Sequence, residues 1–530
     1  MSRPSHVLAV DLGTTGVKVA VVDADAAVLA GAGEVLPMIF TPGGGVEQDP
    51  ENWWQAIGRC ARAAVGRAGL RGDEITVVAV TSQYTSTVAV NAEGRPVSNV
   101  VMWMDTRGKR HNPASRDAST RDRWHEIHGL APNGNDDIGH VAFMRAEWPE
   151  AYAAAHAFVE PMDAVAARLT GHVTATQNTM FPMLAVDNRT WGLTEVKLPI
   201  VPPRNATTRG TPGSAGGTSP RWRSKSPTMP CTCSAGNSAT SSSAQARTID
   251  SVTSAVGTGA IDASRCGLII GTTSVMATHL DSKRMDPDHG LTTAPSPLPD
   301  RWFLVAENGI GGKALDVFVN NVVFPDDGLG VPAPDDAFER VLAAAAVAPA
   351  GAHGVMFLPW LIGSMAPGGQ RSVRGGFVNL GLTSTRAHMA RAVLEGVALN
   401  AAWLLPHFSA LAGVDYGEVS LGGGGAASPL WGQILADCFG LPVRRLANST
   451  TTNAHGAALL ALAEAGALSI DDVPDLLTTA AVHEPSSDST TYQPLLRAFV
   501  DFHDRATPFY DSLNAPVLTP APDIPKDLPS

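Results

Sequence analysis

The stretch HVLAVDLGTTGVKVAVVD, residues 6–23, decides the fold. Two apolar, β-rich runs flank a Gly/Thr turn, and this pattern predicts a hairpin with a polar, flexible bend. The same Gly-Thr-Thr turn recurs between apolar runs in CGLIIGTTSVMATHL, residues 266–280. One such turn alone is more often a plain hairpin than a phosphate-binding loop. The repetition favours phosphate binding, and it predicts two domains of similar ancestry that face a shared cleft.

The length and composition of the chain limit what it can be. Its 530 residues exceed one comfortable core, so two domains of roughly 200–250 residues are expected. The formal net charge of −12 argues against nucleic acid or an anionic membrane as a partner, since both favour basic surfaces. We find no signal-peptide pattern and no apolar run near the ~20 residues of a membrane span, so we expect a cytoplasmic protein. The five cysteines are scattered, which predicts neither a disulfide framework nor a zinc site.

Further elements follow from periodicity and turn signals. Helical spacing is found at residues 51–68, 385–405 and 453–468. Residues 75–82 form an apolar strand that ends in the polar run QYTST, and polar residues just beyond a strand often line a site. Residues 506–530 are rich in proline, which predicts a mobile tail.

The composition changes abruptly between residues 201 and 249. This segment holds six basic residues and no Asp or Glu, while Ser, Thr, Pro and Gly dominate it. No helical or strand period is found there, and a structureless segment of this length inside a compact domain is unusual. We favour the hypothesis that a gene rich in G and C is read out of frame here, because order is lost and regained abruptly. A natural disordered insertion is the alternative.

The residues of the first turn suit phosphate chemistry. Phosphoryl transfer needs donors around phosphate oxygens, a carboxylate that holds magnesium, and a base that orients the acceptor hydroxyl. The turn offers two glycines, which let the backbone approach a phosphate, and the hydroxyls of Thr14 and Thr15. Asp11 ends the preceding strand, where a magnesium-associated carboxylate would be useful, although an Asp there can simply cap the turn. Lys18 could neutralise phosphate charge, but a strand lysine is usually only solvated.

A run of four glycines, Gly422–Gly425, lies between an apolar strand and an amphipathic helix in VSLGGGGAASPLWGQILADCFGLPV, residues 419–443. Such a junction can receive a nucleotide closely. It has neither G-x-G-x-x-G spacing nor the Lys-Ser/Thr end of a P-loop, so it supports neither a dinucleotide fold nor a Walker loop. A tight turn that packs a helix on a sheet is the alternative interpretation.

Taken together, these segments resemble the FGGY family of carbohydrate kinases. The resemblance spans nearly the whole chain and is carried, in the family's order, by AVDLGTTGVKVAVVD, VEQDPENWW, VVMWMDTRG, DSVTSAVGTGA, CGLIIGTTS, RAVLEGVALN and GGGGAASPLWGQILADCFGLPV. It implies an α/β protein with the two-domain actin-like (ribonuclease H-like) ATPase fold and an active site in the interdomain cleft. It also implies transfer of the γ-phosphate of ATP, with Mg²⁺, to a sugar or polyol.

The resemblance also implies domain limits and a catalytic residue. An N-terminal, sugar-binding domain would cover residues 1–250, and a C-terminal, nucleotide-binding domain 251–505. Asp250, in DSVTSAVGTGAID, resembles the family's catalytic aspartate, the general base that accepts the proton of the attacking hydroxyl. The strand and Gly-rich turn that should deliver this aspartate are replaced by SSSAQARTI. We therefore expect Asp250 to be poorly supported, and misplacement by ~1 Å can cost about a hundredfold in rate.

Further roles around the cleft are implied by the same resemblance. Asp11 would lie near magnesium. The residues expected near the nucleotide come from both turns and from two later glycine-rich segments: Thr14, Thr15, Lys18, Thr272, Thr273, Gly312, Gly424 and Gly425. Ala427 stands where the family often has a longer polar residue, so we expect fewer contacts to adenine.

The acceptor side departs most from the family. Where xylulose kinases resemble QMHG and glycerol kinases QRE, this chain has QYTS at residues 83–86. Gln83 keeps the first position, and Tyr84 follows it at the expected substrate side. Asp105 matches a polar substrate-side position of the family, and a carboxylate can accept two hydroxyl hydrogen bonds from a polyol. An ion pair with Arg107 is the alternative role of Asp105.

The expected activity is phosphorylation of a pentulose such as xylulose. A kinase for glycerol or another polyol is the first alternative. A family member that binds nucleotide but has lost catalysis, because of residues 201–249, is the second. An actin- or chaperone-like ATPase is disfavoured by the Trp-containing GGGGAASPLW segment. A homodimer is a further expectation from the resemblance.

Overall fold

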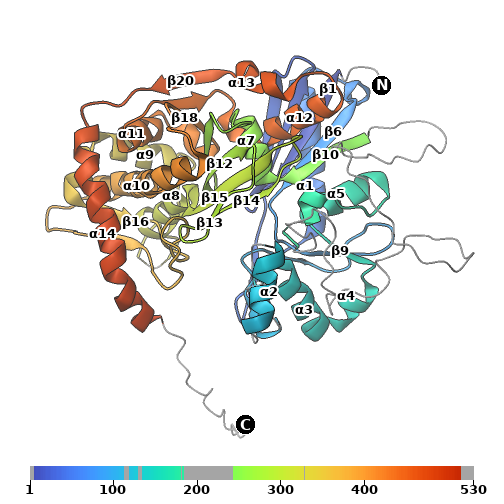
Figure 1. The fold of residues 1–530 in the computed structure, drawn as a ribbon, viewed down its shortest axis with the longest axis horizontal. Coiled ribbons are helices and arrows are strands. Elements are labelled where there is room, and N and C mark those ends of the chain that lie inside the picture. The colour runs from blue at the N-terminus through green and yellow to red at the C-terminus, as the bar shows by residue number, and fades with distance from the viewer. Residues whose placement is uncertain are drawn as a thin grey trace, which may run out of the picture.

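We describe the fold from a computed structural model, which covers residues 5–112, 118–128, 134–180, 182–183, 243–327 and 329–514. Two lobes are built around two large sheets, and the helices α7 (Asp250–Gly257) and α12 (Thr452–Glu464) lie between them (Figure 1). Most of the compositionally unusual segment, residues 201–242, falls outside the described residues.

The two large sheets contain most of the strands. The first has the order β10-β6-β1-β2-β3, with β1 (His6–Leu12), β2 (Gly16–Asp23), β3 (Val28–Val35), β6 (Val77–Ser82) and β10 (Ser243–Ile249). The second has the order β13-β14-β15-β12-β11-β18-β19-β20, with β11 (Cys266–Ile270), β12 (Thr273–Leu280), β13 (Met285–Asp286), β14 (Leu291–Pro295), β15 (Trp302–Ile310), β18 (Val419–Gly422), β19 (Val443–Leu446) and β20 (Thr479–His483).

Five strands of the second sheet repeat the topology of the first. In the first sheet the antiparallel hairpin β1–β2 is flanked by antiparallel β3 on one side and by parallel β6 and β10 on the other. In the second sheet the hairpin β11–β12 is flanked by antiparallel β15 and by parallel β18 and β19 in the same way. The predicted repeat of two hairpins is therefore confirmed, and it extends to a whole five-stranded unit.

The remaining elements surround these sheets. Small sheets pair β4 (Ile39–Thr41), β5 (Gly45–Gln48) and β8 (Val100–Val101), then β7 (Val88–Val90) with β9 (Ala157–Val159), and β16 (Met356–Leu358) with β17 (Gly376–Val378). The other helices are α1 (Pro50–Arg67), α2 (Ala118–His128), α3 (Asp137–Glu147), α4 (Pro149–Ala154), α5 (Pro161–Thr170), α6 (Gln177–Met180), α8 (Gly312–Phe318), α9 (Ala337–Val347), α10 (Arg386–Ala412), α11 (Pro429–Phe439), α13 (Val473–Leu476) and α14 (Ser489–Leu513).

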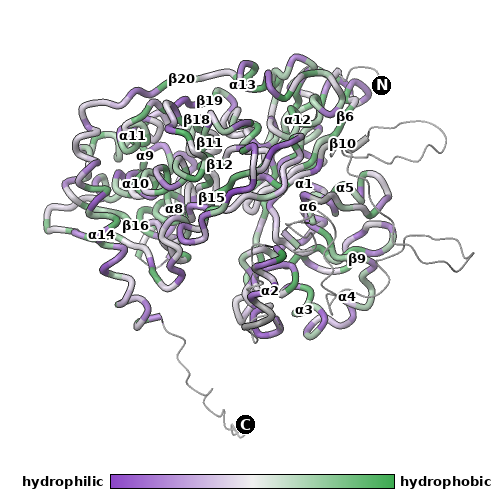
Figure 2. The backbone as a smooth tube through the Cα atoms, viewed as in Figure 1, coloured by the Kyte–Doolittle hydropathy of each residue, from purple (hydrophilic) through white to green (hydrophobic). Residues whose placement is uncertain are grey.

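Each large sheet has its own hydrophobic core. The first core joins β1, β2 and β6 to α1 and to α7 and α12, and the second joins β11, β12 and β15 to α10 and α11. Figure 2 shows the hydrophobic residues gathered along the strands and inner helices of both lobes. The helix α1 begins as its sequence predicts, because Asp49 caps it and Pro50 occupies its first turn.

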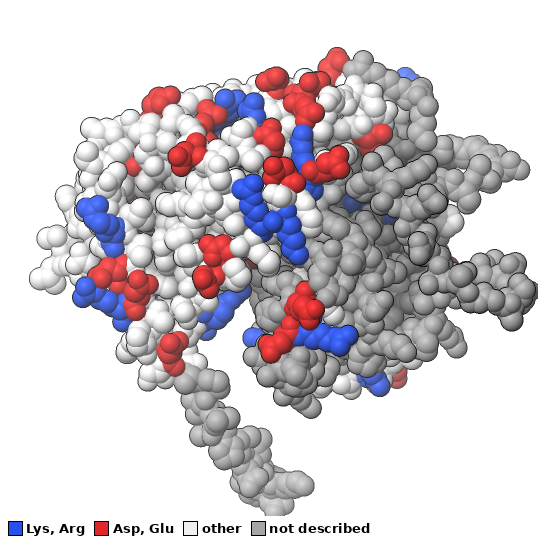
Figure 3. Space-filling view, viewed as in Figure 1, with Lys and Arg blue, Asp and Glu red and all other residues white. Residues whose placement is uncertain are grey.

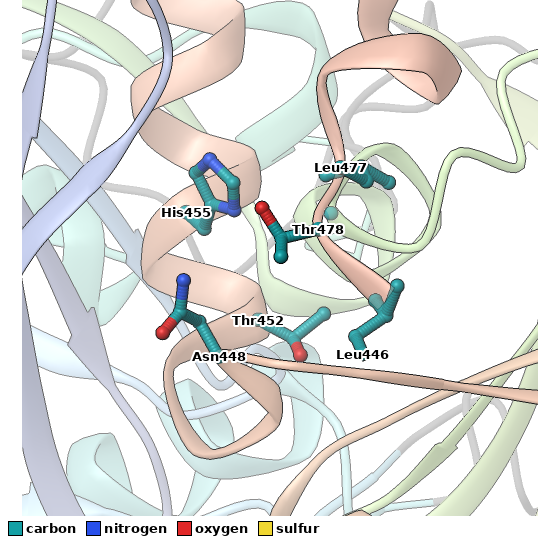
Figure 4. A pocket seen from close by; sticks show the side chains of 7 residues that line it. Leu446, Asn448, Thr452, His455, Leu477 and Thr478 are labelled. Carbon is teal, nitrogen blue, oxygen red and sulfur yellow. The ribbon is translucent and has the colours of Figure 1, made fainter. Parts of the chain in front are cut away.

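The helices α7 and α12 pack backbone to backbone. A Cβ atom on Gly257 would lie 2.2 Å from the carbonyl oxygen of Thr452, and one on Gly456 would lie 1.9 Å from that of Thr253. Only glycine fits at such approaches. A cavity of about 10 Å³ remains beside this contact, lined by His455, Thr452 and neighbouring residues (Figure 4). It has room for about one water molecule, so it is no site for a substrate.

The strand β10 corrects an expectation about the unusual segment. We expected no strand period between residues 201 and 249, yet residues 243–249 form a strand. This strand pairs in parallel with β6, with Thr248 opposite Thr81 and Ile249 opposite Ser82. Backbone pairing to a neighbouring strand needs no apolar alternation, so tertiary context decides the structure here.

The C-terminal helix corrects a second expectation. The predicted tail begins at residue 506, but α14 continues to Leu513. Phe502 and Tyr510 pack against the second core, and this contact holds the helix through Pro508. The rest of the predicted tail, residues 515–530, lies outside the described residues.

The face that Figure 3 shows carries charged side chains of both signs. On the face in Figure 3, acidic and basic residues alternate over the C-terminal lobe without a broad patch of either sign. Among the helices that the structure describes, none combines the length and the apolar character that crossing a membrane requires.

Candidate active site

The first Gly-Thr-Thr loop spans residues 13–16, between the paired residues Leu12 and Val17. The Gly13 N–H donates to the carbonyl oxygen of Gly16 at 2.9 Å and closes the turn. The hydroxyl of Thr14 donates to Gln83 Oε1 at 2.9 Å and accepts from Trp103 Nε1 at 3.0 Å. This loop is therefore held by side chains from two neighbouring segments.

The second loop spans residues 271–273, between the paired residues Ile270 and Ser274. Backbone groups hold it: the Gly311 N–H donates to the Thr272 oxygen at 3.0 Å, and the Gly312 N–H donates to the Gly271 oxygen at 2.7 Å. A Cβ atom on Gly312 would lie 2.7 Å from that same Gly271 oxygen. The predicted residue Gly312 thus lies directly against the second loop, at a distance that only a glycine permits.

The two loops face each other across the lobes. Thr15 Oγ1 lies 3.4 Å from Thr272 Oγ1, although the two residues are 257 positions apart in sequence. Thr14 and Thr273 flank this contact on their own loops. The two Gly-Thr-Thr loops therefore lie together, one from each lobe, and their role as phosphate loops stays a prediction.

Three carboxylates gather beside these loops: Asp11, Asp250 and Glu307. Burial raises the pKa of Asp11 to about 6, against the opposing effect of Lys18, which is its partner across the hairpin. Burial raises the pKa of Asp250 to about 8, and the negative charges of Asp11 and Glu307 raise it further. A carboxyl with a pKa near the working pH is suited to proton transfer.

Asp250 is well anchored through its backbone, contrary to the expectation of poor support. It begins α7 directly after β10. The Thr81 hydroxyl donates to the Thr248 carbonyl oxygen at 2.9 Å, and the Thr253 hydroxyl donates to the Asp250 carbonyl oxygen at 2.9 Å. Asn178 Oδ1 accepts from the backbone N–H of Ile249 at 3.3 Å. Buried hydrogen bonds to β6 and α6, together with a partly buried one within α7, therefore fix the junction that presents the carboxylate.

Asp11 has the features of a carboxylate that holds a cation. Its side chain is 4% exposed, and its Oδ1 atom is buried without a hydrogen-bond partner among the described residues. Asn453, at the start of α12, faces the other side of the carboxyl group and lowers its pKa. A buried carboxylate oxygen with no donor fits a magnesium ion or one of its bound waters, since hard cations prefer oxygen ligands.

Tyr84 links the two lobes by a hydrogen bond. Its hydroxyl donates to Glu307 Oε1, on β15 of the second sheet. Burial raises its pKa, and the negative charges of Glu307 and Asp250 add to this. The segment that carries Tyr84 is held from the other side by Glu160, which accepts from the Thr85 N–H at 3.0 Å. The predicted residue Tyr84 therefore lies in the same cluster as Asp250.

The other predicted acceptor-side residues are engaged with protein. Gln83 accepts a hydrogen bond from the Thr14 hydroxyl and so supports the first loop. Asp105 is fully buried, forms an ion pair with Arg107 at 2.6 Å and accepts from the Val46 N–H at 2.9 Å. The ion pair is the alternative that the sequence offered, and a contact of Asp105 with an acceptor would require Arg107 to move.

The glycine run joins the site at the second loop. Gly423 has φ of 85°, and a Cβ atom there would lie 2.6 Å from the Ile270 oxygen, just before the loop. Gly425 packs against the Ile270 side chain, whereas a Cβ atom on Gly424 would meet nothing within 4 Å. Of the two predicted glycines, Gly424 is thus exposed and has open space beside it. Gly425 is buried against the Ile270 side chain.

Sequence reasoning missed three residues of this cluster: Glu307, Asn453 and Glu160. Glu307 interrupts the apolar run of β15 with a charge, which is a readable signal for a functional position. Asn453 begins a small-residue helix and has no distinctive pattern. Glu160 stands before Pro161 at the start of α5, where an acidic residue has an ordinary structural explanation.

The comparisons with known proteins agree with this geometry. Residues 6–194 match the N-terminal domain, and residues 266–465 the C-terminal domain, of the FGGY family of carbohydrate kinases. Among curated proteins, the chain is 24% identical to a xylulose kinase of Bacillus subtilis, covering 86% of this chain and 87% of the relative. It is 28% identical to a glycerol kinase of Methylibium petroleiphilum, covering 86% and 90%.

Solved structures show the same fold at low sequence identity. A ligand-bound xylulose kinase from Lactobacillus acidophilus aligns with a TM-score of 0.74 at 20% identity, covering 96% of this chain and all of the other. A Plasmodium falciparum glycerol kinase with ADP aligns with a TM-score of 0.70 at 16% identity, covering 94% and 98%. The two-domain actin-like fold that the sequence predicted is thereby confirmed.

Proposed function

Because this chain belongs to the FGGY family of carbohydrate kinases, we propose that it transfers the γ-phosphate of ATP to a hydroxyl group of a pentulose such as xylulose. The observation that carries the proposal is the position of Asp250. It lies beside two phosphate-type loops, in a cluster that raises its pKa to about 8. A base of this strength is matched to the proton of an attacking sugar hydroxyl.

Each part of the cluster has a role in this proposal. Asp250 accepts the proton of the acceptor hydroxyl group. The oxygen of that hydroxyl group attacks the γ-phosphorus in line with the bond to the leaving ADP oxygen. The hydroxyls of Thr15 and Thr272 donate to phosphate oxygens. Lys18 adds positive charge beside them. Gly424 gives the adenosine an open approach.

Asp11 would hold the Mg²⁺ ion, directly or through water. The ion supplies charge neutralisation on the phosphate chain when it is bound. The residues of this chain then keep the site ready for it. Burial of Asp11 excludes water from its Oδ1 atom, and Asn453 orients the carboxyl group.

Contacts between the two lobes complete the proposed site. The bond between Tyr84 and Glu307 joins the acceptor-side segment to the second sheet. It lies beside Asp250, so an acceptor that enters the cleft meets all three groups at once. We propose Tyr84 and Glu307 as residues that contact or align the acceptor.

A glycerol or other polyol kinase is the second candidate. Glycerol kinases are among the relatives with the higher identities, at 28%. The acceptor segment QYTS matches neither the xylulose-kinase nor the glycerol-kinase pattern. The choice between these acceptors therefore depends on measurement of turnover.

The test is acceptor-dependent release of ADP by the purified chain. Xylulose, ribulose, glycerol and erythritol are compared at saturating ATP and Mg²⁺. We expect the highest kcat/KM with a pentulose. A preference for glycerol or erythritol would replace our proposal by the second candidate. Measurable ATP binding with no release for any acceptor would indicate the catalytically impaired family member.

A further inference from the structure

A hairpin turn and a helix bring two histidines and a carboxylate together outside the phosphate loops. Asp286 ends β13, His289 lies in the turn that follows, and His407 lies near the C-terminal end of α10. One ligand atom from each of the three side chains lies within 4.8 Å of the others. The cluster is the only one of its kind in the part of the chain that the structure describes.

The contacts within the cluster are direct. His289 Nδ1 lies 2.7 Å from Asp286 Oδ2, and the backbone N–H of His289 donates to Asp286 Oδ1 at 3.2 Å. The His289 and His407 rings stack with centroids 3.8 Å apart and planes 28° from parallel. All three residues are partly exposed, so an ion can reach them from solvent.

The two elements that carry the ligands are fixed against each other. Arg284, just before β13, donates from Nη1 to the carbonyl oxygens of Leu411 and Ala412, at 3.2 and 2.9 Å. These oxygens belong to the last turn of α10, one turn beyond His407. On the other side of the turn, Leu291 is 1% exposed and anchors β14 in the second core. The cluster is therefore preorganised by contacts other than its own.

We propose that Asp286, His289 and His407 bind a divalent transition-metal ion, with Zn²⁺ as the preferred occupant. Two imidazoles and one carboxylate are a donor set that suits zinc, cobalt, nickel or copper and not magnesium or calcium. Tetrahedral bonds of about 2.0–2.1 Å place ligand atoms roughly 3.4 Å apart. Ligand atoms that lie as far as 4.8 Å apart must approach by up to about 1.4 Å, whereas His289 Nδ1 and Asp286 Oδ2, at 2.7 Å, must separate if both bind the ion. Rotations about the side-chain bonds of these partly exposed residues allow such shifts.

The consequence of binding is a second tie between the β13–β14 turn and α10. The ion would add to the link that Arg284 makes. Because α10 packs against β12 and β15 of the second sheet, the bound ion would stabilise the C-terminal lobe. A solvent molecule can complete the coordination, since only three protein ligands are present.

The proposal is tested by titrating the tag-free, chelator-treated full chain with Zn²⁺ in a calorimeter and with Co²⁺ in the visible spectrum. We expect Zn²⁺ binding at this site and a rise in melting temperature with saturating Zn²⁺. Asp286→Asn should weaken Zn²⁺ binding at least as much as the roughly 10–100-fold loss caused by removing an outer partner of a metal ligand. His289→Ala with His407→Ala should abolish it.

A matched control removes another histidine pair. His353 and His388 also have rings in contact, with centroids 4.9 Å apart, but they belong to no such three-residue cluster among the described residues. The variant His353→Ala with His388→Ala should keep wild-type Zn²⁺ affinity. Equal Zn²⁺ binding by the wild type and by the double variant His289→Ala with His407→Ala would overturn the proposal. The absence of Zn²⁺ binding by the wild type would also overturn it. Asp286→Asn preserves size, so its loss of binding cannot be ascribed to a cavity.

Discussion

The hairpins β1–β2 and β11–β12 are two versions of one device. In both hairpins the turn contains the sequence Gly-Thr-Thr. Both hairpins lie in the middle of sheets with the same topology. They differ in charge and in length. Asp11 faces Lys18 in the first hairpin, whereas Ile269 faces Val275 at the matching place in the second. The first loop also holds four residues between paired strands, and the second holds three.

The two hairpins also differ in what lies beside them. The charged hairpin β1–β2 lies in the same sheet as β10, and Asp250 follows directly after β10. The neutral hairpin lies beside Gly312 and the glycine run, where close backbone approach replaces charge. We infer that one loop supplies charge for the chemical step and the other supplies a neutral cradle for the nucleotide.

Among changes within the two hairpins, the largest expected effect comes from removing the carboxylate charge of the first. Asp11→Asn should lower kcat by about 10²–10³-fold, as expected when one preorganised electrostatic group is lost. Ile269→Val, the matched change in the second hairpin, should leave kcat within about twofold while costing about 0.5–1.5 kcal/mol of stability. Steady-state kinetics and thermal melting measure both. Equal losses of kcat in the two variants would contradict the division of roles.

The dependence on pH should report the carboxylate cluster. In the proposed mechanism Asp250 acts as a base only when it is ionised, and its pKa is raised to about 8. The kcat/KM value should therefore rise about tenfold per pH unit below this pKa and level off above it. Glu307→Gln removes a negative charge that raises the pKa of Asp250. The rising limb of the pH profile of kcat/KM should therefore move to lower pH. The limb belongs to the coupled cluster as a whole.

A matched control for this profile is Glu34→Gln. Glu34 forms an ion pair with Arg59 at the surface and takes no part in the cluster. Its variant should keep the wild-type profile. A Glu307→Gln profile that stays in place, or moves to higher pH, would contradict the assignment of Asp250 as the base.

A smaller effect should distinguish the glycines of the neutral side. Gly312→Ala forces a methyl group against the Gly271 oxygen, so we expect a loss of about 1–3 kcal/mol and a lower melting temperature. Gly424→Ala meets open space, and its melting temperature should stay near that of the wild type. If the adenosine lies over Gly424, this second variant should raise the KM for ATP alone. The opposite pattern of melting temperatures would show that the cradle is misassigned.

The smallest effect is expected at the contact between the loops. Thr15→Val removes a hydroxyl that lies 3.4 Å from the Thr272 hydroxyl, and Thr15→Ser keeps it. We expect Thr15→Val to raise the KM for ATP by up to about tenfold, the value of one hydrogen bond. Thr15→Ser should have nearly wild-type kinetics. If the serine variant is as weak as the valine variant, the hydroxyl is not the group that matters.

The local parts of this site could be predicted from the sequence. Both hairpins were predicted because a Gly-Thr-Thr turn between apolar runs is a signal within a few residues. Thr15 and Thr272 were assigned to facing loops for the same reason. The difference in loop length was not predicted, since it depends on the pairing register and not on composition.

The non-local parts could not be predicted. The strand β10 has no apolar alternation in SAQARTI, and it forms because β6 offers a free edge in the first sheet. Glu307 and Asn453 reach the cluster only through the pairing of the second sheet and the packing of α12. For Asp105 the sequence left an acceptor contact and an ion pair with Arg107 as alternatives, and the fold forms the ion pair.

We propose that β10 delivers Asp250 as the general base. The most direct test compares acceptor-dependent ADP release and ATP affinity in the wild type and in Asp250→Asn, at pH 8 with the preferred acceptor. We predict that the variant binds ATP within about threefold of the wild type, while kcat falls by about 10²–10⁴-fold, the usual contribution of a general base. Turnover by Asp250→Asn within tenfold of the wild type would contradict the account.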